Sequence, residues 1–120
     1  MISGVGIDII EVERIKKLIE KNPRFLSRIF TPQEIAYCQK KKNKYQHFAA
    51  RFAAKEAFFK ALGRKIKWTD IGLTNLSSGK PILGVYGDKL KEKLASTKIH
   101  VSISHLSQHA AAVVILEKDR

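Results

Sequence analysis

The stretch from Phe48 to Gly63, FAARFAAKEAFFKALG, constrains the fold more than any other part of the sequence. Its alanines favour a helix, and it stops at a glycine, the residue preferred just beyond a helix C-terminus. At about 100° per residue, three phenylalanines and six alanines occupy opposite sides of this helix. A helix this apolar is normally buried. We therefore predict a central helix in the core, beginning near Gln46 or His47.

Two charged residues of this helix, Glu56 and Lys60, lie one turn apart at the expected edge of the core. One interpretation is an ion pair between positions i and i+4, which contributes about 0.2–0.5 kcal/mol. The other is that the carboxylate and the ammonium face a bound ligand, which the small alanines allow to approach closely. The helix alone does not decide between them.

Asp8 stands out in the N-terminal segment. Val5 to Ile10 is short, β-branched and nearly all apolar, which is typical of a buried strand. A carboxylate in that setting must be ion-paired, hydrogen-bonded or metal-bound to offset its desolvation. Capping of the next helix is an equally open structural explanation for Asp8.

Three shorter helices are expected before the central one. Residues 11–21 form an amphipathic pattern, and Asn22-Pro23 is typical of the start of a short helix. Thr31-Pro32-Gln33-Glu34 has the residues of a capping box, with the helix running to about Gln39. The first two helices have basic outer sides.

After Gly63 the pattern changes to strands. We expect them near residues 71–73, 81–86, 99–104 and 110–116, with a turn at 75–80 and a short helix capped by Asp88. His100, Ser102 and Ser104 share one strand face, which is either its solvated side or a set of phosphate donors. Helices followed by antiparallel strands predict an α+β fold, with the N-terminal strand and helices packed on an antiparallel sheet.

Length and charge limit the classes of function. A chain of 120 residues predicts one domain spanning 1–120, and the single Cys38 favours a cytoplasmic protein without disulfides. We expect no membrane span and no cleaved signal segment. The net charge is +12, and residues 1–67 alone carry a net charge of +10. A polyanionic partner is therefore expected, which leaves a basic nucleic-acid-binding protein as an alternative. A metal-dependent nuclease using Asp8, Glu56 and Lys60 is a second.

Three stretches together resemble one known family. GIDIIEVERI at 6–15, FAAKEAFFKALG at 52–63 and VSISH at 101–105 are similar to the holo-acyl-carrier-protein synthases, the short type of 4′-phosphopantetheinyl transferase. The resemblance implies transfer of phosphopantetheine from coenzyme A to a serine of an apo-acyl carrier protein, with Mg²⁺, in support of fatty acid biosynthesis. It also implies a homotrimer with sites between subunits, and no nucleic acid partner.

The resemblance assigns roles to particular residues. Asp8 and Glu56 would hold the metal, and Lys60 would contact the phosphate. The residues expected along coenzyme A are Lys60, Gly63, Gly79, Lys80, Pro81, Ser104 and His105. Acyl carrier proteins are acidic, so we expect them to dock on the basic early helices, at Arg14, Lys17, Arg24 and Arg28. The proton acceptor for the serine is either Glu56, through a water, or His105.

Two positions depart from the family's usual pattern. Arg64-Lys65-Ile66 follows Gly63, where a second glycine is common, so the loop contacts to coenzyme A there stay open. His109 stands where an aromatic residue is common shortly after VSISH. The sequence assigns His109 no role.

Overall fold

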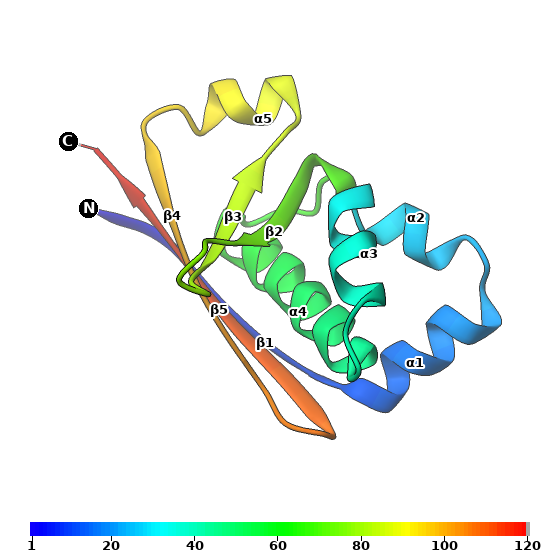
Figure 1. Ribbon diagram of the computed structural model, residues 1–120. Helices are drawn as coiled ribbons and strands as arrows, with labels where there is room; N and C mark the ends of the chain where they lie inside the picture. Colours follow the sequence, from blue (N-terminus) through cyan, green and yellow to red (C-terminus); the bar gives the residue numbers. More distant parts are fainter. Residues whose placement is uncertain (120) are drawn as a thin grey trace.

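The protein folds as an α+β structure in which one long helix lies against a three-stranded sheet. In the computed structural model, which describes residues 1–119, α4 runs along β1 and β5 (Figure 1). The elements in chain order are β1 (Ile2–Glu11), α1 (Val12–Lys21), α2 (Phe25–Ile29), α3 (Pro32–Gln39), α4 (Lys44–Leu62), the 3₁₀ helix η1 (Trp68–Asp70), β2 (Ile71–Asn75), β3 (Pro81–Val85), α5 (Asp88–Lys93), β4 (Thr97–His105) and β5 (His109–Lys118).

The strands form two antiparallel sheets. The larger has the strand order β1-β5-β4, and the smaller is the hairpin of β2 and β3. The register places Asp8 opposite Ala112, and Ser104 opposite Ala111 on the other side of β5. The predicted α+β class and antiparallel pairing are therefore confirmed.

The local signals for the helices were mostly correct. Thr31 caps α3, its side chain accepting from the Glu34 N–H while the Glu34 carboxylate accepts from the Thr31 N–H, as the capping-box pattern predicts. Gly63 ends α4 with φ of 87°, a left-handed conformation that favours glycine. The predicted side-chain cap at Asp88 is wrong, because that residue is already the first of α5. The central helix begins two or three residues earlier than predicted, at Lys44.

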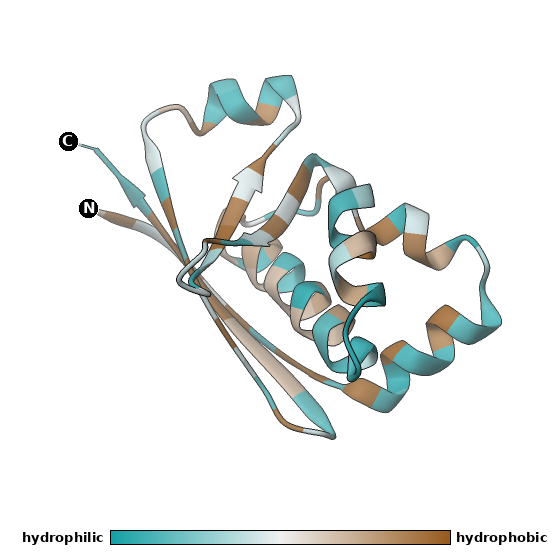
Figure 2. Cartoon of the chain, viewed as in Figure 1, coloured by the Kyte–Doolittle hydropathy of each residue, from teal (hydrophilic) through white to brown (hydrophobic). Residues whose placement is uncertain are grey.

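The prediction of a strand buried on both sides at residues 5–10 is wrong for one side. Val5, Ile7 and Ile9 are 59%, 67% and 68% exposed. Because strand side chains alternate, the other side of β1 carries Gly4, Gly6, Asp8 and Ile10 toward α4. Figure 2 shows hydrophobic residues along β1, whereas α5 and the loop after α3 are largely hydrophilic. One chain thus leaves an apolar stripe uncovered on its outer sheet face.

The contact between α4 and β1 sets the geometry of the core. A Cβ atom on Gly4 would overlap the carbonyl oxygen of Ala61, and one on Gly6 would overlap that of Ala57. The alanine side of α4 therefore meets a glycine side of β1 at close range. The expectation that these alanines admit a ligand is wrong, because Ala53, Ala54 and Ala57 are fully buried.

We predict that Gly6→Ala lowers the free energy of unfolding by about 1–3 kcal/mol, the usual cost of overpacking. The reason is that the backbone of α4 has to move away from the new Cβ atom. The matched control is Gly84→Ala, whose new Cβ would lie 2.9 Å from the Tyr86 hydroxyl, on a side chain that can shift. Urea denaturation of both variants checks this. Equal losses of stability would show that the close approach of α4 and β1 is not the constraint.

Candidate active site

Asp8 and Lys60 meet where β1 crosses α4. The Lys60 ammonium donates to the Asp8 carboxylate at 3.2 Å and to the carbonyl oxygen of Ile7 at 2.9 Å. The Asp8 side chain is 16% exposed and that of Lys60 is 54% exposed. A largely sheltered carboxylate is thus reached by an ammonium that remains open to solvent. Asp8 is therefore ion-paired and hydrogen-bonded, as a carboxylate in an apolar setting requires.

Glu56 lies one helical turn before Lys60 on α4. Its only ion-pair partner within residues 1–119 is Lys65, at 3.9 Å, and its side chain is 25% exposed. The alternative of a Glu56–Lys60 ion pair is wrong for this structure, because Lys60 is directed to Asp8 instead. Glu56 is left as a loosely held carboxylate, one helical turn before the lysine that contacts Asp8.

These two carboxylates suit a magnesium ion. Mg²⁺ is usually bound through one or two carboxylates, with phosphate oxygens and water completing its octahedron. Among residues 1–119, no group of three or more His, Cys, Asp or Glu side chains is placed to hold a metal. A site on Asp8 and Glu56 would accordingly depend on substrate oxygens, which is the arrangement typical of phosphoryl transfer.

The predicted nucleotide residues of the β2–β3 turn are held to the middle of α4. Gly79 has φ of 91°, and its N–H donates to Leu76 across the turn. The Asn75 amide donates to the Gly79 carbonyl oxygen at 3.0 Å and accepts from the Arg51 guanidinium at 2.8 Å. Lys80 and Pro81 follow directly, with Lys80 exposed. Arg51 thus positions the turn that carries Gly79, Lys80 and Pro81.

Arg51 is the residue that the sequence analysis missed. It is 1% exposed, and the Tyr37 ring lies 4.3 Å from its guanidinium carbon. No carboxylate of residues 1–119 pairs with it, and its Nε has no hydrogen-bond partner there. A buried cation is normally paired, so this arrangement favours an anion nearby. The available signal was an arginine within the otherwise apolar stretch 48–52 of the central helix.

His105 lies at the end of β4, against the first turn of α4. Its Nδ1 is 2.9 Å from the Gln46 side-chain oxygen, and its ring is 5.1 Å from that of His47. Burial, followed by His105, Arg51 and Lys41, lowers the pKa of His47 to about 4. His47 is therefore neutral near pH 7. Ser104 next to His105 is exposed, on the solvated side of β4.

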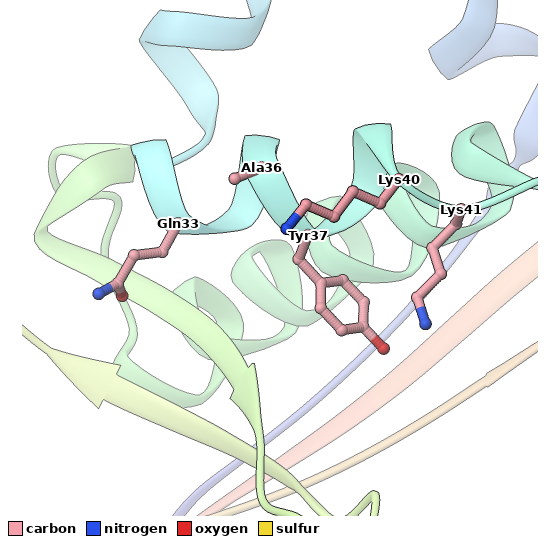
Figure 3. Close-up of a pocket in the computed structure, with 5 residues that line it drawn as sticks. All are labelled: Gln33, Ala36, Tyr37, Lys40 and Lys41. Carbon is pink, nitrogen blue, oxygen red and sulfur yellow. The ribbon is translucent and has the colours of Figure 1, made fainter.

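A groove with a volume of about 430 Å³ runs beside α3, lined by Gln33, Ala36, Tyr37, Lys40 and Lys41. Figure 3 shows these side chains projecting from one side of α3 and the loop after it. Lys41 lies 4.7 Å from the Tyr37 ring, which also contacts Arg51. The groove therefore adjoins the Arg51 region and adds two cations to it.

The predicted site residues, together with Arg51, form two groups in one chain. We call Asp8, Glu56 and Lys60 the acid cluster, and Arg51, His105 and the turn of Gly79 to Pro81 the basic cluster. Gln46, which binds His105, precedes Glu56 by ten residues, or about 15 Å along a helix axis. Ser104 belongs with the basic cluster by sequence position. Arg51 precedes Glu56 by only five residues, or about 7.5 Å along α4, so within one chain it is the His105 end of the basic cluster that lies away from the acid cluster.

The remaining predicted residues are accessible. Gly63 is exposed at the end of α4, on the side of the acid cluster along the helix. All four predicted docking cations, Arg14, Lys17, Arg24 and Arg28, are exposed on α1, α2 and the turn between them. Within residues 1–119, no helix is long and apolar enough to span a membrane.

Comparison with known proteins shows the family of the chain. The model of the 4′-phosphopantetheinyl transferase superfamily matches residues 4–114. A holo-acyl-carrier-protein synthase of Clostridium tetani is 48% identical over 123 residues, which cover 98% of this chain and 97% of that protein.

Solved structures agree with the sequence matches. A holo-acyl-carrier-protein synthase of Bacillus anthracis, solved in complex with CoA (3′,5′-ADP), has a TM-score of 0.84 and 38% identity, covering 99% of each chain. The synthase of Neisseria meningitidis has a TM-score of 0.87 and 33% identity, covering 98% of this chain and all of that one. The chain therefore belongs to the 4′-phosphopantetheinyl transferase superfamily and, within it, to the holo-acyl-carrier-protein synthases.

Proposed function

We propose that the protein transfers 4′-phosphopantetheine from coenzyme A to a serine of an apo-acyl carrier protein, releasing adenosine 3′,5′-bisphosphate, in support of fatty acid biosynthesis. The observation that carries this proposal is the acid cluster, in which Lys60 contacts Asp8 at 3.2 Å one turn after Glu56. Membership of the holo-acyl-carrier-protein synthases and the likeness to a coenzyme A complex of that family support it.

Each residue of the acid cluster has a separate task in this reaction. The serine hydroxyl attacks the phosphorus next to pantetheine, its proton leaves, and the bond to the nucleotide phosphate breaks. Asp8 and Glu56 would hold Mg²⁺, which neutralises charge on the pyrophosphate when bound. Lys60 stabilises the negative charge that develops on the phosphate oxygens. Glu56 would accept the serine proton through a water, with His105 as the alternative acceptor.

The basic cluster would hold the nucleotide part of coenzyme A. Gly79, Lys80 and Pro81 would lie by the adenine end, with Ser104 and His105 along the nucleotide and Gly63 nearer the acid cluster. The buried Arg51 guanidinium, without a carboxylate partner in residues 1–119, favours a phosphate in this region. Lys40 and Lys41 in the adjoining groove add to the positive potential.

A homotrimer would bring the acid cluster of one subunit to the basic cluster of the next. The exposed stripe of Val5, Ile7 and Ile9 continues onto Val113 and Ile115 of β5, which oppose Ile7 and Val5. Apolar patches of this kind mark interaction surfaces. Because Asp8 lies between Ile7 and Ile9 on β1, a subunit that covers the stripe would lie against the strand that carries Asp8.

The carrier protein would dock on α1 and α2, where Arg14, Lys17, Arg24 and Arg28 are exposed. Acidic carriers would meet these cations at the rim of the site. We also propose that the reaction takes place in the cytoplasm, in keeping with a single, buried, unpaired Cys38. The alternative of a nucleic-acid-binding protein gives Asp8 and Glu56 no task, because acids repel phosphate unless a cation bridges them.

We predict that wild-type protein adds phosphopantetheine to an apo-carrier protein in the presence of coenzyme A and Mg²⁺, as detected by mass spectrometry. Asp8→Asn and Glu56→Gln should abolish transfer with circular dichroism unchanged, because the metal loses a ligand. Lys60→Ala should lower kcat more than it changes the KM for the carrier. Glu92→Gln, an exposed acid on α5, is the control and should match wild type. Normal turnover of folded Asp8→Asn and Glu56→Gln variants would contradict the assignment.

A further prediction concerns docking. Arg14→Glu or Arg28→Glu should raise the KM for the carrier protein and leave coenzyme A affinity nearly unchanged, because rim charges act mainly on encounter. Added salt should lower wild-type kcat/KM for the carrier more than that of the variants, since charges are screened within about 8 Å at physiological ionic strength. Lys91→Glu, on α5, is the control. A loss of coenzyme A affinity instead, or an unchanged salt slope, would place the docking face elsewhere.

A further inference from the structure

A fully buried ion pair includes Lys55, the residue that precedes Glu56 on α4. The Lys55 ammonium is 2.7 Å from the Glu34 carboxylate, and both side chains are completely inaccessible. Lys55 also donates to the carbonyl oxygens of Ile29, at 2.7 Å, and Trp68, at 3.1 Å. An ammonium has three hydrogens to donate, so these partners use all of them.

Glu34 extends the same network to two further segments. One of its carboxylate oxygens accepts from the Thr31 N–H, at 2.9 Å, and the other from the Leu73 N–H, also at 2.9 Å. Through Lys55 and Glu34, α4 is joined to the end of α2, the start of α3, η1 and β2. The network therefore connects the middle of α4 to four of the segments around it.

Lys55 immediately precedes Glu56, so the two side chains leave α4 about 100° apart. Ala57 and Ala61 on the same helix lie against Gly6 and Gly4 of β1. α4 is thus fixed by close contact on the side of β1 and by hydrogen bonds on the side of Lys55. A rotation or shift of α4 would move Glu56 relative to Asp8, which is on β1.

Stability alone does not account for this pair. Taking two charges out of water costs several kcal/mol per ion, and well-packed apolar replacements of buried pairs are often neutral or stabilising. Burial lowers the pKa of Lys55, and the neighbouring Glu34 opposes that shift. The attested benefit of such a pair is the fixing of one arrangement of the surrounding segments.

We propose that Lys55 and Glu34 are positioning residues, which fix the rotation of α4 so that Glu56 and Asp8 are correctly spaced for one metal ion. The inference rests on the proposed function for the identity of that metal site. Of the two lysines in the segment AAKEAFFK, Lys55 then has a structural role in the interior, and only Lys60 contacts the substrate.

The test compares wild type with the double variant Glu34→Gln/Lys55→Met, which removes both charges of the pair, so that neither is left buried without the other. Mn²⁺ replaces Mg²⁺ as the probe, and its binding is followed by electron paramagnetic resonance without carrier protein. We expect Mn²⁺ affinity to fall about 10-fold, the size typical when support behind a metal ligand is removed. The kcat for transfer should fall as well, with a smaller change in the KM for the carrier.

Two controls separate positioning from stability. Leu90→Ala removes a buried side chain of α5 outside the network, and should lower the midpoint of thermal unfolding without changing Mn²⁺ affinity or kcat. Asp8→Asn sets the level of Mn²⁺ binding outside the proposed site. If the double variant does not fold, Glu34→Gln alone, which keeps the bonds from Lys55 to Ile29 and Trp68, is measured in the same way.

Wild-type Mn²⁺ affinity and kcat in the folded variant would overturn the inference, as would an equal loss in Leu90→Ala. Wild-type protein that binds Mn²⁺ no better than Asp8→Asn would overturn it too. If wild type binds Mn²⁺ but converts no carrier protein, the proposed function fails. The comparison of Mn²⁺ affinities still decides whether Lys55 and Glu34 position Glu56.

Discussion

The close approach of α4 to β1 is the constraint on which the rest of the structure depends. It exists because Gly4 and Gly6 present no side chain where the backbone of α4 passes at Ala61 and Ala57. That approach puts Asp8, two residues after Gly6, within reach of Lys60, one turn after Glu56. A bulkier residue at either glycine would separate the strand that carries one acid from the helix that carries the other. Packing and chemistry therefore share the same few residues.

The four charged residues of α4 that interrupt its apolar face differ in their surroundings. Arg51 and Lys55 are buried, Glu56 is partly covered and Lys60 is exposed. Lys55 is satisfied by Glu34 and two carbonyl oxygens, whereas Arg51 has only the Asn75 side chain, a long contact to the His47 carbonyl oxygen and the Tyr37 ring within residues 1–119. The contrast separates a structural cation, whose bonds are complete, from one that still has capacity for an anion.

Local patterns in the sequence predicted much of the fold. The capping box at Thr31, the glycine at the end of α4 and the alternation in β4 each depend on a few neighbouring residues, and the structure contains them. The burial of one side of β1 was predicted wrongly. A run of apolar residues does not show which side of a strand packs against the rest of the same chain. The Glu34–Lys55 pair was missed because its two residues are 21 positions apart, and the capping role already accounted for Glu34. Asp8, Glu56 and Lys60 were predicted from the sequence as candidate site residues, but only the fold shows that Lys60 contacts Asp8.

The distance along α4 from Glu56 to the end that holds His105, together with the uncovered apolar stripe of β1, motivates the central proposal, that one active site takes residues from two subunits. The direct measurement is complementation between two inactive variants, Glu56→Gln and Lys80→Ala/His105→Ala, co-expressed with different tags and purified as mixed oligomers. If neighbouring subunits of the proposed homotrimer share a site, one of the three sites in each mixed trimer is intact, and about a third of wild-type transfer should return. If each site lies within one subunit, every site in the mixture is inactivated by the substitutions of one variant or the other. Mixed oligomers no more active than either variant alone would contradict the account.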